Sequence, residues 1–409
     1  MIDLVLLREN SQHIAAQVKK KDPSFAIEKL IELDEQLRAL RLKVEQLRYT
    51  KNQLAEQAKT GITPEIRNQS IETGKIFKES EPVLHDMEKA FSDLYLHCPN
   101  IPDAEIPLGG KEANKVVAVY GQKPTFNFAI KNHVELGEAL QWIDFKVAAQ
   151  MAASNFVLYK GEAVQLMYAL TLFMLQHNKK HGYSMVLPPY LVNAQSLQNA
   201  SNFPKFKDQV YAASDDLFLI PTSEASLANM YRDTIFTHQE LPIRMTSWTS
   251  CFRREAGTYG ATERGLIRIH QFEKVELYTY CVPEESPAEL EKMLACATEL
   301  LQQLGLHYRV SLLAAQDCSF PSAKTYDIEV WMPAQNAYYE VSSCSNCTDF
   351  QARRAGVRYR KAVHEKTHLV HTLNGSSLAL PRLMVALMEA YQQPDGTIVI
   401  PEVLKKFWI

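Results

Sequence analysis

Two consecutive stretches of seven-residue repeats constrain the fold of the N-terminal quarter of this chain. In the first stretch, apolar residues recur at alternating steps of three and four positions: Leu30, Leu33, Leu37, Leu40, Val44, Leu47 and Leu54. Lys51 occupies one position of this series. The second stretch keeps the spacing with some small polar members: Ile66, Ser70, Thr73, Phe77, Ser80, Leu84, Met87, Phe91, Leu94 and Cys98. Such spacing is typical of the apolar seam of a coiled coil.

Between the two stretches, the sequence from Thr60 to Pro64 contains a glycine and a proline that end one helix and begin the next. Two helices of similar length joined by a short turn fold back antiparallel. A helix over residues 27–60 would be roughly 50 Å long, so we expect an arm over 27–98 that projects from the rest. An ordinary amphipathic pair packed on a core is the alternative. Pro82 lies inside the second helix and should bend or interrupt it.

The composition changes near residue 100, and we expect three segments in the chain. They are an N-terminal domain over 1–105, a linker over 106–125, and a C-terminal domain over 126–409. Strand-like runs in the last segment lie near 185–192, 243–253, 266–280, 326–332 and 338–343. Helical patterns cover 162–180, 286–304 and 378–392. Hairpin-connected strands with flanking helices predict an α+β fold on an antiparallel sheet.

The bulk composition excludes several classes of protein. The chain has 409 residues and a formal net charge of -3, so any contact with nucleic acid must use a local basic patch. Neither a GxxxxGK[ST] loop nor a GxGxxG fingerprint is present, which argues against a P-loop NTPase or a Rossmann dehydrogenase. The seven scattered cysteines, the absence of a signal peptide and the lack of a membrane-length apolar run favour a cytoplasmic protein without membrane contact.

The densest cluster of chemical groups lies in two runs, Cys251–Gly257 and Arg264–Leu277, joined by a polar loop. Because side chains alternate along a strand, the second run should point Ile267, Ile269, Val275 and Leu277 into a core. The opposite face should then carry Arg268, His270, Phe272, Lys274 and Glu276. Arg253 and Glu255 share one face of the first run. Such a face suits a ligand with phosphates, an amine and a flat base, although a surface hairpin with weak ion pairs has the same pattern.

Five motifs resemble the seryl-tRNA synthetases, a family of class II aminoacyl-tRNA synthetases. FRREAG…RGLIRIHQFEKVEL looks like motif 2 of that class, LNGSSLALPR at 373–382 resembles motif 3, and the segment from Gly182 to Val192 resembles the dimer-forming motif 1. PTSE at 221–224 is similar to the family's serine-binding loop, and YEVSSCSNC at 339–347 to its strand for ATP and magnesium. The arm and the motifs follow the family's order along essentially the whole chain.

The resemblance implies a homodimeric enzyme that activates serine with ATP and transfers it to tRNA(Ser), with tRNA(Sec) as a further option. It assigns catalytic roles to Arg253, Glu276 and Arg382. It places ATP against Arg253, Arg254, Glu255, Ile269, Phe272, Glu340, Val341, Ser342, Ser343 and Arg382. It places serine against Thr222, Ser223, Glu224, Arg253, Glu276, Asn374 and Ser376. Mg²⁺ would bind Glu340 and Ser343, whose hard oxygen atoms suit that ion.

Arg382 can also be interpreted without the resemblance. Pro381 is tolerated only in the first turn of the apolar helical pattern that follows, so Arg382 lies at the positive end of the helix dipole. A bound anion would reverse this unfavourable placement, and the family puts the γ-phosphate there. An ion pair with a nearby carboxylate is the alternative. Cys344 and Cys347 form a CxxC pair without a second pair, which does not favour a zinc site.

Two other functions are compatible with parts of the pattern. A synthetase-like enzyme could adenylate an amino acid for a different acceptor, such as a carrier protein. The expected arm argues against this function, because it can reach RNA far from the acceptor end. A non-catalytic relative used for binding is the second alternative. Retention of Arg253, Glu276 and Arg382 argues against it.

Overall fold

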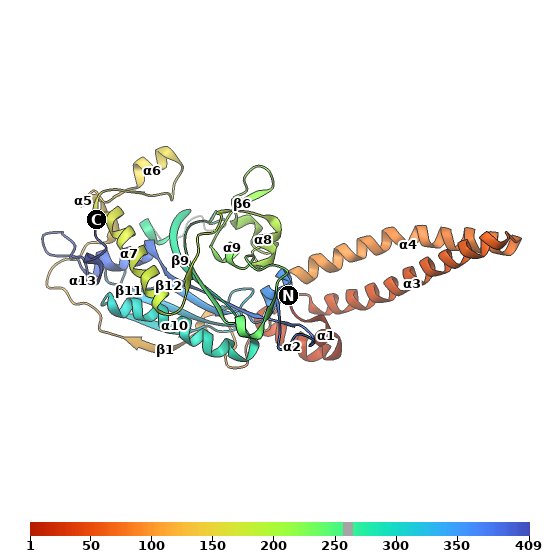
Figure 1. The fold of residues 1–409 in the computed structure, drawn as a ribbon. Coiled ribbons are helices and arrows are strands. Elements are labelled where there is room, and N and C mark those ends of the chain that lie inside the picture. Colours follow the sequence, from red (N-terminus) through yellow and green to blue (C-terminus); the bar gives the residue numbers. More distant parts are fainter. Residues whose placement is uncertain (257–264) are drawn as a thin grey trace. The chain divides into compact units, whose positions relative to one another are not determined.

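The computed structural model describes residues 1–256 and 265–409, which divide into two compact units, Met1–Ile101 and Pro102–Ile409 (Figure 1). Each unit is described by itself. The loop 257–264, which includes Gly257 and Arg264 of the dense cluster, lies outside the described residues. Within the described part of the chain, no helix combines the length and the apolar character needed to cross a membrane.

The first unit consists of helices, of which two are long and pack on each other along the expected seam. Its elements are α1 (Leu4–Glu9), α2 (Ser11–Lys21), α3 (Ile27–Thr60) and α4 (Pro64–Leu96). Leu30, Leu37 and Val44 of α3 are buried. The turn follows its sequence signals: Gly61 ends α3, the Thr63 Oγ1 accepts a hydrogen bond from the Ile66 N–H at 3.2 Å, and Pro64 is the first residue of α4. These helices fit a coiled-coil arm.

Two irregular residues of the arm, Lys51 in the seam and Pro82 outside it, are accommodated within the helices. Lys51 remains exposed, and its Nζ lies 5.0 Å from the centroid of the Phe77 ring, so a cation–π contact replaces apolar packing there. Helix α4 continues through Pro82, which does not interrupt it. A proline removes only one backbone hydrogen bond, and the packing of the rest of α4 on α3 outweighs that local loss.

The second unit is built on an eight-stranded sheet with the order β1-β10-β11-β12-β15-β9-β8-β4. All neighbouring strands are antiparallel except β4 and β8, which are parallel. The strands of this sheet are β1 (Lys115–Tyr120), β4 (Ser184–Met185), β8 (Ile243–Phe252), β9 (Gln271–Cys281), β10 (Tyr308–Leu312), β11 (Lys324–Met332), β12 (Ala337–Asn346) and β15 (His371–Ala379). The expected α+β fold on an antiparallel sheet is therefore confirmed.

Helices and short strands complete the second unit. The helices are α5 (His133–Ala139), α6 (Phe145–Met151), α7 (Glu162–Lys180), α8 (Ala194–Asn199), α9 (Glu224–Leu227), α10 (Ser286–Gln303), α11 (Phe350–Ala355), α12 (Leu380–Ala390) and α13 (Glu402–Lys405). The short strands are β2 (Ile143–Asp144), β3 (Leu158–Tyr159), β5 (Leu191–Asn193), β6 (Leu217–Leu219), β7 (Ile235–Thr237), β13 (Arg358–Arg360) and β14 (His368–Leu369).

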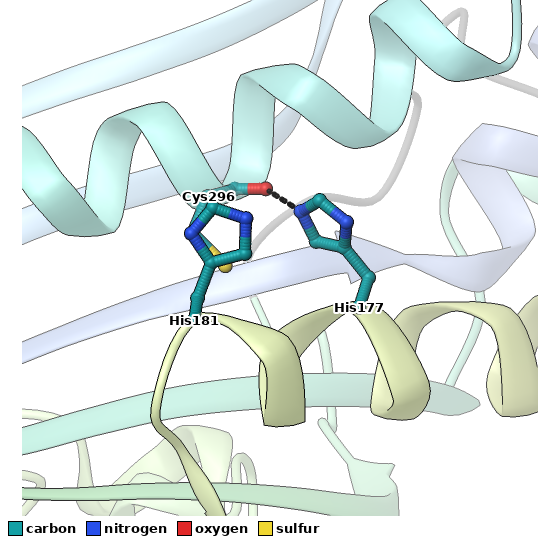
Figure 2. A group of neighbouring side chains, drawn as sticks. All are labelled: His177, His181 and Cys296. Carbon is teal, nitrogen blue, oxygen red and sulfur yellow. Dashed lines mark hydrogen bonds between the residues drawn. The ribbon is translucent and has the colours of Figure 1, made fainter.

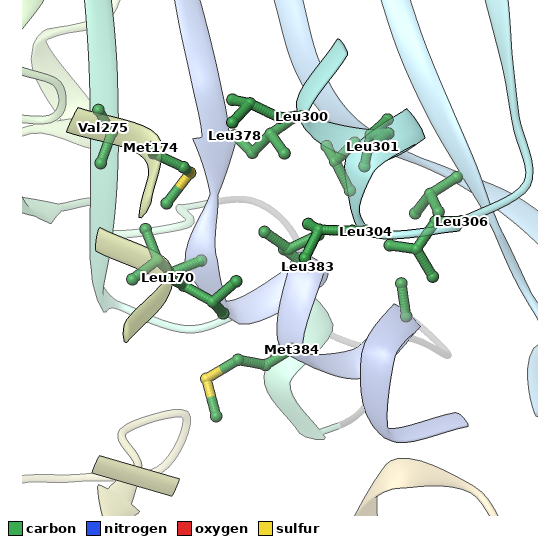
Figure 3. Packing of buried hydrophobic residues seen from close by; sticks show 14 of the residues in the cluster. Leu170, Met174, Val275, Leu300, Leu301, Leu304, Leu306, Leu378, Leu383 and Met384 are labelled. Atoms are coloured by element: carbon green, nitrogen blue, oxygen red, sulfur yellow. The ribbon is translucent and has the colours of Figure 1, made fainter. Parts of the chain in front are cut away.

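The sheet has an apolar core on each face, and β9 shows how the two are separated. Val275 and Leu277 belong to the larger core, which α7, α10 and α12 cover with residues such as Leu170, Leu300 and Leu383 (Figure 3). Tyr278 and Tyr280 belong to the smaller core under α8, α9 and α11. The alternation along β9 therefore leaves Lys274 and Glu276 on the face of the smaller core, where they can meet a ligand.

The structure corrects three expectations about local elements. Residues 185–192 do not form one strand, because β4 ends at Met185 and the prolines at 188 and 189 lack the N–H groups that a strand needs. The strand expected from 266 begins only at Gln271, after a 3₁₀ turn over Gly265–Ile267. Part of the expected linker 106–125 is β1, an edge strand paired with β10, since the run Val-Val-Ala-Val favours extended backbone.

Candidate active site

A polar cavity of about 200 Å³ opens between β9, β12, β15 and the start of α12. Its lining residues are Arg253, Glu255, Leu266, Ile267, Arg268, Ile269, Phe272, Lys274, Glu340, Val341, Ser376, Ala379, Pro381 and Arg382. The structure thus brings together ten residues that the sequence pointed to: Arg253, Glu255, Arg268, Ile269, Phe272, Lys274, Glu340, Val341, Ser376 and Arg382. Three guanidinium groups in one cavity are typical of a site for a polyanion.

Arg253 and Phe272 form one wall of the cavity. Arg253 follows the last residue of β8, and its Nε donates a hydrogen bond to the Pro221 carbonyl oxygen at 3.2 Å. Its guanidinium carbon lies 5.2 Å from the centroid of the Phe272 ring. The link to Pro221 ties Arg253 to the Pro221–Glu224 loop, so this arginine lies at the junction of two predicted subsites.

Arg268 and Glu255 form an ion pair inside the cavity. The Arg268 Nη1 donates a hydrogen bond to the Glu255 Oε2 at 2.8 Å. His270, which was expected on the same face, instead turns its Nδ1 to the Arg253 carbonyl oxygen at 2.9 Å and does not line the cavity. The reason is the turn at Gly265–Ile267, which breaks the strict alternation before β9 begins.

Arg382 lies in the first turn of α12 and faces Glu340. Its Nη1 donates to the Glu340 backbone oxygen at 2.8 Å and lies 3.7 Å from the Glu340 Oε2. The Nε donates to the Ile267 carbonyl oxygen at 3.3 Å. This geometry is compatible with both predicted roles of Arg382, an ion pair with a carboxylate and the binding of an anion. The contact with the Glu340 carboxylate is loose, and the guanidinium still lines the cavity.

Behind the cavity lies a buried group of polar side chains. The Lys274 Nζ donates to the Thr222 Oγ1 at 2.7 Å and forms an ion pair with Glu276. The Thr222 hydroxyl in turn donates to the Glu276 Oε2 at 3.1 Å. Only 8% of the Lys274 side chain and 2% of the Glu276 side chain are exposed. A buried charge pair of this kind contributes little net stability, so a role in binding a charged ligand is the better explanation.

Glu224 is the second carboxylate of this group and lies at the start of α9. Its Oε1 accepts hydrogen bonds from the Gln351 Nε2 at 2.6 Å and from the Asn374 Nδ2 at 3.1 Å. Burial and the negative charge of Glu276 raise the pKa of Glu224 to about 7, although the hydrogen bond from Gln351 opposes the shift. A cationic ligand such as an amino-acid ammonium would reverse this effect by favouring the ionised form.

A further acidic residue, Asp327, lies near Glu340 but outside the cavity lining. Asp327 is opposite Ser343 in the pairing of β11 with β12. Burial and the charge of Glu340 raise the pKa of Asp327 to about 8. Its buried Oδ1 has no hydrogen-bond partner among the described residues. A set of hard oxygen donors with one unsatisfied member fits a divalent cation such as Mg²⁺.

Several predicted residues lie outside the lining of the cavity. They are Arg254, Thr222, Ser223, Glu224, Glu276, Asn374, Ser342 and Ser343. Of these, Thr222, Glu224, Glu276 and Asn374 belong to the buried polar group. Arg254 is exposed, with its backbone N–H bonded to the Gln209 carbonyl oxygen at 2.9 Å. The Ser342 hydroxyl donates to the Ser376 carbonyl oxygen, which holds β12 against β15.

The sequence placed Lys274 on the ligand-binding face without a specific role, and it assigned no role to Gln351 or Asp327. For Lys274 and Asp327 a signal existed, because each alternates with apolar residues along its strand and faces the polar side. For Gln351 no local signal existed, since it lies on α11 and reaches Glu224 across a separation of 127 residues. Its role depends on tertiary contacts alone.

An antiparallel sheet that carries arginines and carboxylates around one polar cavity is the architecture of a class II aminoacyl-tRNA synthetase. A protein-family model described as "tRNA synthetase class II core domain (G, H, P, S and T)" matches residues 205–391. A second model, "Seryl-tRNA synthetase N-terminal domain", matches residues 1–102.

Similar proteins specify the family. The chain is 45% identical to a serine--tRNA ligase of Dehalococcoides mccartyi, over 100% of this chain and 98% of that relative. The crystal structure of a Pyrococcus horikoshii seryl-tRNA synthetase complexed with ATP matches with a TM-score of 0.91 and 34% identity, covering 100% of this chain and 98% of the other. A Naegleria fowleri serine-tRNA ligase in complex with AMP matches with a TM-score of 0.85 at 26% identity, covering 100% and 97%. The chain belongs to the seryl-tRNA synthetase family, as the sequence motifs predicted.

Proposed function

We propose that this chain attaches serine to the 3′ end of tRNA(Ser) in two steps at the cavity described above. Family membership supports the reaction. The single observation that carries the division of roles is the position of Arg253, which joins an arginine-lined cavity to a buried carboxylate pocket. The cavity is the proposed ATP subsite, and the pocket of Thr222, Glu224 and Glu276 is the proposed serine subsite.

In the ATP subsite, Phe272 would stack on the adenine ring and Glu255 would accept a hydrogen bond from the adenine amino group. Arg268, which is paired with Glu255 at 2.8 Å, would then exchange part of that contact for a phosphate. Arg382 would bind the γ-phosphate at the N-terminus of α12. The remaining proposed contacts are those of Ile269, Val341, Ser342 and Arg254. Arg254 is the least supported, because its side chain lies outside the cavity lining.

For Mg²⁺, we propose that Glu340 and Ser343 provide the protein ligands, with Asp327 beside them. When bound, the ion neutralises part of the charge on the phosphates. Glu340 serves in two ways, because its backbone oxygen accepts the Arg382 guanidinium at 2.8 Å while its carboxylate remains available. The Ser342 hydroxyl keeps β12 on β15 and so fixes the strand that presents both ligands.

In the serine subsite, Glu224 and Glu276 would bind the ammonium group and the hydroxyl, with Thr222 and Ser376 as further polar contacts. Ser223 is buried, and Asn374 supports Glu224 through its hydrogen bond of 3.1 Å. A pocket built around the hydroxyl would leave its own polar groups unpaired with alanine, which gives strong discrimination against that amino acid. Lys274 holds Thr222 and Glu276 in place for this contact.

The chemistry follows from this arrangement. A serine carboxylate oxygen attacks the α-phosphorus of ATP, the bond to the β-phosphate oxygen breaks, and pyrophosphate leaves with the electron pair. Arg253 would neutralise both the carboxylate and the developing charge on the phosphoryl oxygens. In the second step, a hydroxyl of the terminal tRNA ribose attacks the seryl carbonyl carbon and AMP leaves. The released proton passes to the phosphate or to water, so no protein base is required.

The helical arm is the proposed contact for tRNA away from its 3′ end. It offers Lys29, Arg38, Arg41, Lys43, Arg48, Lys51, Arg67, Lys75 and Lys78. Arg38, Arg41 and Arg48 lie in ion pairs with acidic residues of the arm. Within the described ranges, no ion pair involves Lys29, Lys43 or Lys75, so these lysines are available for phosphates. Such contacts would be sensitive to salt. Whether tRNA(Sec) is charged as well requires that RNA in the same assay.

We also propose a homodimer in the cytoplasm. An apolar groove of about 500 Å³ runs along Val186–Pro189 and the start of α8, next to β4 at the edge of the sheet. Leu187 and Met185 beside it are 73% and 53% exposed. Apolar surface of this kind favours burial against a second subunit. A mass measurement by light scattering at micromolar concentration tests the proposal, and a monomeric mass in an active preparation would contradict it.

The test of the function is serine-dependent exchange of pyrophosphate into ATP, measured across the standard amino acids, followed by charging of tRNA(Ser). We expect exchange with serine far above that with alanine or threonine, and transfer to the tRNA. Exchange without transfer to any tRNA would favour an enzyme for a different acceptor. The absence of exchange with every amino acid, in a folded protein, would favour a non-catalytic relative.

A further inference from the structure

A group of metal-binding side chains lies on the other face of the sheet from the ATP and serine subsites. His177 and His181 are one turn apart in and after the last turn of α7, and both imidazoles project toward α10 (Figure 2). The ligand atoms of His177, His181 and Cys296 lie within 4.8 Å of one another. Glu299, one turn beyond Cys296 on α10, lies beside this group and contacts both imidazoles.

Glu299 is the residue that joins the two imidazoles. Its Oε2 lies 3.0 Å from the His181 Nε2 and 3.8 Å from the His177 Nε2. Ligand atoms about 2.0–2.1 Å from a tetrahedral ion are separated by roughly 3.4 Å, so both distances are close to those of a metal site. The three residues also line a hollow of about 190 Å³, which leaves room for a water ligand.

Cys296 is less suited to the role of ligand. Its side chain is fully buried, and its Sγ donates to the Asn178 Oδ1 at 3.4 Å. The His177 Nε2 lies 3.0 Å from the Cys296 carbonyl oxygen, a contact that a metal would replace. Because that carbonyl lies inside α10, its helical hydrogen bond remains.

The surroundings of the imidazoles favour a particular kind of ion. The Gln303 amide lies 3.2 Å from the His177 Nδ1, and after the amide rotates its oxygen can accept a hydrogen bond from the Nδ1–H, as partners of metal-bound histidines do. Lys180 and Lys406 also line the hollow, and their charges disfavour Ca²⁺ or Mg²⁺, which are bound mainly by electrostatic attraction. An ion with a strong preference for imidazole, such as Zn²⁺, is less affected.

We propose that His177, His181 and Glu299 form a structural site for Zn²⁺ or a similar first-row transition ion that ties α7 to α10. Such a tie would act close to the serine subsite, because Asn178 follows His177 and its Nδ2 donates to the Thr246 Oγ1 at 2.9 Å. Thr246 in turn donates to the Glu276 backbone oxygen at 2.9 Å. The ion would therefore stabilise the hydrogen bonds that hold α7 against β8 and β9, and it would not contact the substrates.

The experiment measures Zn²⁺ binding to the full-length protein after chelator treatment, in saturating Mg²⁺ to occupy oxygen-rich sites. Wild-type protein should bind one Zn²⁺ per chain by calorimetry, and its melting temperature should rise with Zn²⁺. Glu299→Gln and His181→Gln, at partly exposed positions, should each lower the affinity at least ~10-fold. His85→Gln, an exposed histidine on α4, is the matched control and should bind as wild type.

Cobalt distinguishes the ligand sets. Co²⁺ bound in place of Zn²⁺ should give the visible bands of a four- or five-coordinate ion without a sulfur-to-cobalt charge-transfer band, and Cys296→Ser should leave the spectrum unchanged. A charge-transfer band lost in Cys296→Ser would overturn the assignment of Glu299. Equal Zn²⁺ affinity of wild type, Glu299→Gln and His181→Gln would show only an ordinary histidine–glutamate ion pair and sink the proposal.

Discussion

One ion pair of the arm and one ion pair of the catalytic unit differ sharply in burial. In the arm, Arg41 and Glu88 pair at 2.8 Å across the two helices with 51% and 41% of their side chains exposed. In the catalytic unit, Lys274 and Glu276 pair where 8% and 2% are exposed. Exposed pairs contribute little to stability, whereas buried charges are costly to desolvate. Exposed charges of the arm can therefore bind RNA at little cost in folding stability, whereas the buried charges of the pocket are best explained by a role in substrate binding.

The largest effect is expected at the cavity. Arg253→Ala should lower serine-dependent pyrophosphate exchange by about 10²–10³-fold or more, because a donor to the transition state is lost. The melting temperature should remain near that of wild type, since Arg253 is exposed and makes one hydrogen bond to a carbonyl. Arg254→Ala is the comparison variant and should lose much less activity, because this proposed ATP contact does not line the cavity. Near wild-type exchange in folded Arg253→Ala would rule out the assignment.

Removing the arm should separate the two units by function. Replacing residues 27–98 with a short flexible linker should preserve serine-dependent exchange, because the arm shares no residues with the cavity. Charging of tRNA(Ser) should be almost lost. Both assays are made on one purified variant of unchanged oligomeric state. Charging at comparable efficiency would show that the arm is not the recognition element, and collapse of exchange without unfolding would contradict the division into units.

The buried ion pair of Lys274 with Glu276 can be broken by mutation and compared with the exposed pair of Arg41 with Glu88. Lys274→Met leaves Glu276 without its cation and should destabilise the fold by about 3–5 kcal/mol. Lys274→Met combined with Glu276→Leu should recover much of the lost free energy of unfolding, measured with denaturant. Serine-dependent exchange should be abolished in both variants. Arg41→Ala in the arm should change stability by only about 0–1 kcal/mol. Similar losses at both pairs would remove the contrast between the units.

The smallest expected effect is a pH dependence of serine binding. The raised pKa of Glu224, about 7, means that its carboxyl holds a proton below that pH, while serine's ammonium requires the ionised form. The KM for serine should therefore rise as the pH falls from about 8 to about 6, and the KM for ATP should change less. A pH-independent KM for serine over this range would show that Glu224 does not bind the ammonium.

The raised pKa of Glu224 also predicts that the free energy of unfolding depends on pH. Because the folded state holds the proton more tightly than the unfolded state, stability of the free enzyme should fall as the pH rises from 4.5 to about 7. Glu224→Gln should reduce this slope in thermal unfolding curves recorded across the range, and Asp327, whose pKa is raised to about 8, should account for the slope that remains. Identical slopes in wild type and Glu224→Gln would place the titration on another residue.

Features that depend on periodicity or on turn chemistry were determined by the sequence alone. The heptad seam, the turn at Gly61 and Pro64, and helix α7 are local patterns, and the structure reproduces them. The polar face of β9 from Phe272 to Glu276 also follows from alternation. Each of these depends on residues a few positions apart, whose geometry the backbone determines.

Features that join distant segments were decided only by the tertiary structure. The hydrogen bond from Gln351 to Glu224 and the pairing of β1 with β10 have no local signature. The convergence of His177, His181 and Glu299 requires α7 to lie against α10, which is determined by the apolar core that they share. The late start of β9 depends on a long-range contact, since the His133 Nε2 accepts the Leu266 N–H at 3.2 Å and holds that segment in a turn. Packing of remote side chains, which no short window of sequence encodes, is the physical reason for all of these.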